Sequence, residues 1–167
     1  MLLSVLFVLA LVGLDQWVKY WVSTHLALGE TAPLWEGVLQ LRRVHNTGGG
    51  WSILSDYTGL LTLITALVLA VLLFLLIKGH IRHPFGRWMA LLLFAGGMGN
   101  LIDRVRLGYV VDMFDCQFMR YPVFNVADIF VVTGIIGCAI YYLFLYEKYD
   151  APKKEPEAHG TPDSDCP

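Results

Sequence analysis

Charged residues are scarce in this sequence. Of its 167 residues, 12 are Lys or Arg and 14 are Asp or Glu, which gives a formal net charge of -2, whereas 56% are hydrophobic. A soluble domain of this size cannot hide so much apolar surface from water, so we expect a single membrane-embedded domain. The weak net charge also argues against a basic patch, and we expect no nucleic-acid partner.

The sequence also lacks the usual signatures of disulfide, metal and nucleophile chemistry. Cys116, Cys138 and Cys166 lie far apart without metal-ligand spacing, so we predict no disulfide framework. There is no His-Glu-x-x-His and no Gly-x-Ser-x-Gly motif. His80 and His83 share a basic loop, but so short a motif seldom marks a metal site. We therefore expect no metal and no cofactor.

The sequence instead contains four apolar segments near the length of roughly 20 residues that crosses a bilayer as a helix. They cover residues 2–22, 57–77, 88–104 and 124–145. The fold class predicted is an all-α membrane protein with four transmembrane helices, forming one domain over residues 1–147. No Lys or Arg precedes the first segment and no clear cleavage site follows it, so we expect a retained helix. Residues 148–167 are rich in Lys, Glu, Pro and Asp and predict a disordered cytoplasmic tail.

The connections between these segments differ in character. Within Ser23–Asp56, the stretch Val38–Val44 indicates a partial strand, and a glycine-rich run follows it. The connection between the second and third helices carries Lys78, Arg82 and Arg87 in a short span. This density of positive charge favours placing that connection, and both termini, in the cytoplasm.

The unusual polar residues all fall at one end of an up-down-up-down bundle. They are Asp15, Lys19, Asn46, Asn100, Asp103, Arg104, Asp112, Asn125 and Asp128. Ionisable residues inside a membrane are costly and usually functional, so this end is predicted to hold a site. Two neighbouring carboxylates can share a proton, so that one accepts a proton from water and the other donates to a carbonyl oxygen. Lys19 with Ser23 is a weaker candidate, because Asp15 one turn away keeps the Lys19 amine charged.

Five short motifs resemble, in order, those of the bacterial lipoprotein signal peptidases, also called type II signal peptidases. The matching stretches are Leu14–Lys19, Asn46–Gly48, Gly96–Arg104, Gly108–Met113 and Phe124–Asp128. The third resembles the glycine-rich Asn-x-x-Asp-Arg block, the fourth the Val-Val-Asp block, and the fifth the Phe-Asn-x-Ala-Asp block. After its first glycine the loop has Gly-Gly-Trp, where the family more often has Ala-Ala-Phe. The resemblance covers about residues 1–147.

The resemblance implies an aspartyl endopeptidase of the bacterial inner membrane with its active site at the outer face. It implies cleavage of prolipoproteins just before a cysteine that bears a diacylglyceryl group, with Asp112 and Asp128 as the catalytic pair. It also implies inhibition by globomycin and a small extracytoplasmic β-sheet and mobile loop between the first two helices. The candidates for substrate positioning are Asp15, Lys19, Asn46, Gly48, Asn100, Arg104 and Asn125. We further expect contact with membrane lipid and a monomeric state.

Simpler structural interpretations exist for the same residues. Asn125 and Asp128 also form a helix N-terminal signature, in which Asp128 only caps the helix. Asp103 and Arg104 are also candidates for a structural ion pair. As a whole, the chain is alternatively a small transporter or proton-relay subunit, or a structural subunit that binds a partner helix. A transporter would spread its carboxylates across the membrane depth and carry inverted repeats, and neither is evident.

Overall fold

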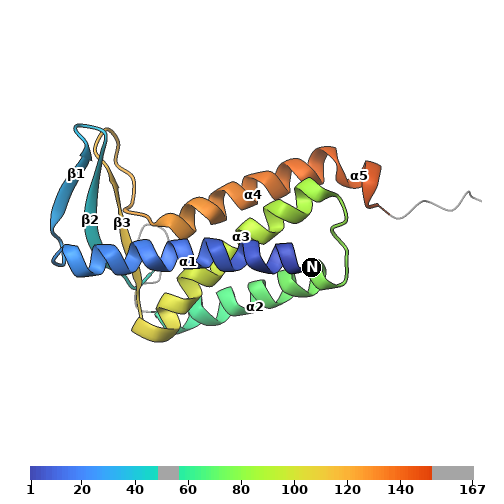
Figure 1. Cartoon of the computed structure of the whole chain (residues 1–167), viewed down its shortest axis with the longest axis horizontal. Helices are drawn as coiled ribbons and strands as arrows, with labels where there is room; N and C mark the ends of the chain where they lie inside the picture. The colour runs from blue at the N-terminus through green and yellow to red at the C-terminus, as the bar shows by residue number, and fades with distance from the viewer. Residues whose placement is uncertain (49–56, 152–167) are drawn as a thin grey trace, which may run out of the picture.

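The computed structural model describes residues 1–48 and 57–151, and it consists of a helix bundle with a small sheet at one end (Figure 1). Its helices are α1 (Leu2–His25), α2 (Thr58–Ile77), α3 (Pro84–Leu107), α4 (Val126–Phe144) and the short α5 (Tyr146–Tyr149). The first four are long and apolar enough to cross a membrane. The α3 helix begins at Pro84, before the predicted start at residue 88, because proline is favoured at the first helical position.

Glycines allow α3 to pack closely against both α1 and α4. A Cβ atom on Gly96 would come within 2.5 Å of the Ala127 carbonyl oxygen of α4. A Cβ atom on Gly99 would come within 2.5 Å of an Asp15 carboxylate oxygen of α1. Small residues at such positions let helix backbones approach each other in a membrane. The α3 helix therefore brings its polar upper end into contact with two other helices.

The sheet has three antiparallel strands in the order β1 (Thr31–Trp35), β2 (Leu39–Asn46) and β3 (Val110–Cys116). The β2 strand corresponds to the partial strand predicted from the sequence. The sequence analysis predicts a sheet formed only by the region between the first two helices. In the structure the sheet also includes β3, which lies between α3 and α4 in the chain. Gly108 ends α3 with φ of 79°, a left-handed conformation that suits glycine, and the chain enters β3 two residues later.

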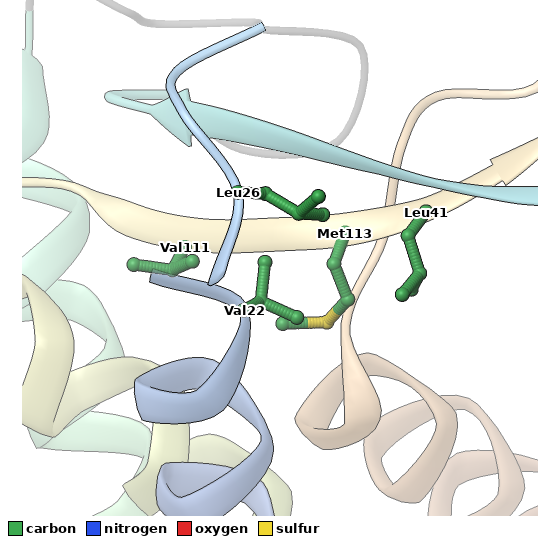
Figure 2. Close-up of a cluster of buried hydrophobic side chains, with 5 residues drawn as sticks. All are labelled: Val22, Leu26, Leu41, Val111 and Met113. Carbon is green, nitrogen blue, oxygen red and sulfur yellow. The ribbon is translucent and has the colours of Figure 1, made fainter. Parts of the chain in front are cut away.

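A hydrophobic cluster joins the sheet to the end of α1 (Figure 2). Its buried members are Val22, Leu26, Leu41, Val111 and Met113. Burial of an aliphatic side chain of this size stabilises a fold by about 1.5–3 kcal/mol, so the cluster fixes the sheet on the helix. Successive side chains of a strand point to opposite faces. Because Val111 and Met113 face the cluster, Asp112 between them faces the other side of the sheet.

The opposite end of the bundle is closed by the segment that follows α4. One carboxylate oxygen of Asp150 accepts hydrogen bonds from the backbone N–H groups of Arg82 and His83, at 3.0 and 3.1 Å. The Tyr141 hydroxyl donates to the same oxygen. The segment predicted as a tail from residue 148 therefore begins with residues that contact the start of α3. Residues 152–167 lie outside the described part of the chain.

Candidate active site

Polar side chains of the membrane helices and of the sheet meet where the sheet joins the bundle. Asp112 of β3 and Asp128 of the first turn of α4 line one cavity of about 210 Å³, which we call the dyad cavity. Its polar lining also includes Asn46 of β2 and Asn100 and Arg104 of α3. The two carboxylates that the resemblance implies as a pair thus share one cavity with three of the predicted positioning residues.

Two buried asparagines connect the carboxylates. The Asn125 side-chain amide donates to Asp112 Oδ1 at 2.7 Å and to Asn100 Oδ1 at 3.0 Å. The Asn100 amide in turn donates to Asp128 Oδ1 at 2.8 Å. This continuous chain of three hydrogen bonds fixes the orientation of both carboxyl groups. Because amides do not titrate near neutral pH, the chain positions the acids without competing for their proton.

The remaining carboxylate oxygens also accept one N–H group each. Asp112 Oδ2 accepts from the Asn46 amide at 2.9 Å, and Asp128 Oδ2 accepts from the Asn125 backbone N–H at 3.1 Å. Asn125 and Asp128 form a reciprocal capping box, so Asp128 does cap α4. The cap does not exclude chemistry, because each carboxylate oxygen has a second lone pair available to a water or substrate.

The environment of Asp112 favours its protonated form. The side chain is buried, and burial together with the nearby charge of Asp128 raises the pKa of Asp112 from 3.8 to about 7. The hydrogen bonds from Asn46 and Asn125 act in the opposite direction but do not cancel this effect. Asp112 therefore changes its protonation state near neutral pH, as a proton-sharing acid requires.

Lys19 forms a buried ion triad with Asp15 and Asp103, next to the dyad. Its ammonium contacts Asp15 Oδ2 at 2.9 Å and Asp103 Oδ2 at 3.0 Å, and it donates to Asn100 Oδ1 at 3.0 Å. Three acceptors use all three ammonium protons. The Lys19 amine is thus fully engaged and is not a base for Ser23. The structure also pairs Asp103 with Lys19, and the predicted pairing of Asp103 with Arg104 is wrong.

The two acids of the triad hold the backbone immediately before each member of the dyad. Asp15 Oδ1 accepts from the Ala127 N–H at 2.9 Å, one residue before Asp128. Asp103 Oδ2 accepts from the Val111 N–H at 3.1 Å, one residue before Asp112. The triad therefore positions both acids through the main chain.

The Gln16 side chain links the two acids of the triad. Its amide donates to Asp15 Oδ2 at 3.2 Å and to Asp103 Oδ1 at 2.9 Å. Gln16 had no site role predicted from the sequence, and Asp103 was counted among the polar residues of the site and as a candidate partner of Arg104. Both side chains support the dyad without lining its cavity.

Arg104 connects the dyad cavity to the loop after β2. Its Nη2 donates to the Gly48 carbonyl oxygen at 3.1 Å, and the Gly48 N–H donates to Asn46 Oδ1 at 2.9 Å. Gly48 therefore contributes its backbone to the site. The rest of the predicted glycine-rich stretch, including Trp51, lies outside the described residues.

Two larger cavities adjoin the dyad. The first, of about 340 Å³, contains Asp128 and the apolar α4 side chains Ile129 and Val132, and we call it the apolar cavity. The second, of about 820 Å³, lies between β2, β3 and the connection 117–123, and we call it the sheet-side cavity. It shares Asn46 and Asp112 with the dyad cavity. Within residues 1–48 and 57–151, no group of three or more His, Cys, Asp or Glu side chains is arranged to hold a metal ion.

Comparison with known proteins agrees with this arrangement. A family model described as signal peptidase (SPase) II matches residues 7–144. A lipoprotein signal peptidase of Enterococcus faecalis is 46% identical over 138 residues, covering 83% of this chain and 85% of that protein. One of Streptococcus thermophilus is 40% identical over 129 residues, covering 77% of this chain and 84% of the relative.

Solved structures agree as well. A bacterial membrane enzyme determined by the in meso method at 2.3 Å resolution has a TM-score of 0.80 and 31% identity, covering 94% of this chain and 96% of that one. A second, at 1.9 Å resolution, has a TM-score of 0.79 and 33% identity, covering 86% and 94%.

Proposed function

This chain belongs to the signal peptidase II family, and on that premise we propose that Asp112 and Asp128 are its catalytic pair. The chain is a multi-pass membrane aspartyl endopeptidase that removes the signal peptide from prolipoproteins. The single observation that supports this assignment of the pair is their shared cavity, in which Asn125 and Asn100 join the two carboxylates by hydrogen bonds.

In the proposed reaction, Asp112 holds the shared proton at rest, as its raised pKa of about 7 favours. Asp128 takes a proton from a water molecule, whose oxygen attacks the scissile carbonyl carbon, while Asp112 protonates the carbonyl oxygen. The tetrahedral intermediate then collapses, and the carbon–nitrogen bond breaks. The leaving nitrogen takes the proton from Asp128, and the re-forming carbonyl returns a proton to Asp112.

The positioning residues have distinct proposed roles. Asn46, Asn100 and Asn125 orient the carboxyl oxygens, and the triad around Lys19 holds the backbone that carries them. Arg104 stabilises negative charge in the cavity and holds Gly48, whose backbone is a candidate contact for the substrate chain. Preorganised groups of this kind lower the barrier because they need no rearrangement during the reaction.

The proposed substrate carries a diacylglyceryl group on the cysteine that follows the cut. The apolar cavity beside Asp128 suits a lipid-bearing or aliphatic group, because it lies along the lipid-exposed face of α4. We further propose that a globomycin-type cyclic peptide binds in the dyad cavity, that membrane lipid covers the bundle, and that the enzyme acts as a monomer.

We also propose that the dyad lies at the outer face of the membrane, with both termini in the cytoplasm. The connection from α2 to α3 lies at the end of the bundle opposite the sheet (Figure 1), and it carries or adjoins the basic residues Lys78, Arg82 and Arg87, which supports this orientation. Labelling of single cysteines in intact cells tests it. A membrane-impermeant reagent should react at Glu36→Cys beside the sheet and not at Lys78→Cys; the reverse pattern would invert the orientation.

Cleavage of a synthetic lipidated prolipoprotein peptide by the purified protein in lipid tests the catalytic assignment. Asp112→Asn and Asp128→Asn should each reduce the rate by at least about 10²-fold, the lower range for general acid–base catalysis. Glu36→Gln makes the same chemical change at an exposed turn of the sheet and should leave the rate unchanged. Full activity in both aspartate variants would refute the mechanism.

A further inference from the structure

The sheet-side cavity extends well beyond the dyad. It shares Asn46 and Asp112 with the dyad cavity, and it continues along β2 to Arg42. Asn46 lies four residue steps along the strand from Arg42, a span of about 13 Å at roughly 3.3 Å per residue. Arg120, from the connection between β3 and α4, lines the same cavity. A cavity of about 820 Å³ is large enough for several residues of an extended peptide.

The two arginines in this cavity have unused binding capacity. Both are exposed, and neither side chain forms a hydrogen bond or an ion pair with any residue in the described ranges. The neighbouring Arg43 is different, because its guanidinium donates to the carbonyl oxygens of Ser23 and Leu26 at 2.9 and 3.0 Å. Arg43 thus fixes the sheet to α1, whereas Arg42 and Arg120 have ten N–H donors between them that bind no residue of the described ranges.

The other titratable groups of the cavity do not neutralise these arginines by direct contact. The Asp115 carboxylate accepts a hydrogen bond from the Gln40 amide at 2.8 Å and forms no ion pair among the described residues. The His45 ring stacks on Tyr109 with centroids 3.8 Å apart, and burial and Arg43 lower the pKa of His45, so it adds no charge at neutral pH. In the part of the cavity away from the dyad, two cations, Arg42 and Arg120, therefore stand against one carboxylate, Asp115.

The direction of the cavity indicates which part of the substrate enters it. The apolar cavity follows the flank of α4, whereas the sheet lies past the start of α4, beside the last turns of α1 (Figure 1). A signal peptide is apolar and remains with the helices. The residues after the scissile bond must leave the bilayer. The sheet-side cavity starts at Asp112 and leads along the sheet, so it offers these residues a path out of the helix bundle.

We propose that the sheet-side cavity binds the first residues after the cleavage-site cysteine, and that Arg42 and Arg120 select acidic over basic side chains there. The proposal rests on the proposed function. A peptide advances at most about 3.3–3.6 Å per residue, so the cavity reaches roughly four residues beyond the cut. A guanidinium binds a carboxylate through two parallel N–H bonds, whereas a lysine at the same place would be repelled.

The expected selectivity is modest because the arginines are exposed. An exposed ion pair changes an equilibrium by about 1.4- to 5-fold, so two arginines together correspond to about a 2- to 25-fold preference. We expect the lower part of this range, about 3- to 10-fold, at low ionic strength. Asp115 lies in the same cavity and keeps the preference near the lower end. Roughly 0.5 M salt should reduce it towards one, since exposed charges are then screened within a few ångströms.

The test uses three lipidated peptides that differ only by Asp, Asn or Lys at the third residue after the cysteine. The measurement is the ratio of kcat/KM for the Asp peptide to that for the Lys peptide, because a ratio cancels changes in total activity. The ratio should be about 3 to 10 in the unmodified enzyme and near one in the Arg42→Gln, Arg120→Gln double variant. Arg120→Glu should favour the Lys peptide.

Arg82→Gln is the matched control, because Arg82 lies in the connection from α2 to α3, at the other end of the bundle, and it should keep the original ratio. A ratio of one in the unmodified enzyme at low salt, or an unchanged ratio in the double variant, would overturn the proposal. If none of the three peptides is cleaved, the proposed function itself fails. If all three are cleaved equally, the proposed function stands and only the charge selection is lost.

Discussion

Replacing Lys19 by Met removes the one cation of the buried triad and leaves Asp15 and Asp103 without a counterion. The ammonium lies 2.9 and 3.0 Å from the two carboxylates, and the three side chains are at most 4% exposed. Each contact corresponds to on the order of 5 kcal/mol at an effective dielectric constant of about 20. Removing one partner of a buried pair costs about 3–5 kcal/mol after desolvation is included, and we expect Lys19→Met to lose stability in that range.

The same variant should lose activity beyond what unfolding explains. Repulsion between the two acids would disturb the hydrogen bonds to the Ala127 and Val111 backbones, which precede Asp128 and Asp112. A displacement near 1 Å can reduce the rate by about 10²-fold. Thermal unfolding in detergent and kcat/KM on the folded fraction measure the two effects separately.

A double-mutant cycle identifies the ionic contact as the cause. Asp103→Asn removes one of the charges that Lys19 neutralises, so Lys19→Met should cost at least about 2 kcal/mol less in that background. Lys78→Met is the control; this lysine lies 5.9 Å from the Phe74 ring centroid at the other end, and its loss should change stability by about 0.5 kcal/mol or less. Independent effects of the two substitutions, or full activity in folded Lys19→Met, would refute the reasoning.

Three further outcomes follow from the site. Because the proposed mechanism uses protonated Asp112, kcat/KM should fall as pH rises through about 7, and a rate that stays level from about pH 5 to about pH 9 would remove Asp112 as the acid. Gly99→Ala should cost about 1–3 kcal/mol in a thermal unfolding assay, because its Cβ would meet Asp15, whereas Gly59→Ala in open space should be neutral or stabilising. Asn125→Ala should destabilise α4 by about 0.5–2 kcal/mol and reduce cleavage at least tenfold. Asn125→Ser, which is neutral, should recover the cap without the amide bridge, so stability returns and cleavage does not.

Much of the helical fold and the location of the site could be predicted from the sequence. Long apolar runs define the four helices, and polar residues inside them are costly enough to mark the site. The strand that carries Asp112 was missed because four successive residues of β3 are buried, so no alternation marks it. Its pairing with β2 connects Asp112 to Val44, a contact between distant parts of the chain that no local pattern reveals.

The roles of individual polar residues were harder to predict. Asp103 and Arg104 were considered as a structural ion pair, but neighbouring residues of a helix point in different directions. Its true partner, Lys19, lies on another helix. Asn125 carried a recognisable capping signal through its oxygen, but the bonds from its amide to Asp112 and Asn100 depend on the packing of α3, α4 and the sheet.

The two acids lie on different elements, since the sheet carries Asp112 and the first turn of α4 carries Asp128. The α1 helix contacts both: Val22 packs against the sheet, and Asp15 binds the backbone at the start of α4. The stretch from Asp15 to Val22 spans about 10 Å, at roughly 1.5 Å per residue. The length of this stretch therefore fixes the distance between the carboxyl groups of Asp112 and Asp128. An inserted residue there would turn one contact about 100° from the other, so the length of this stretch should tolerate no change, unlike the exposed turn at Glu36.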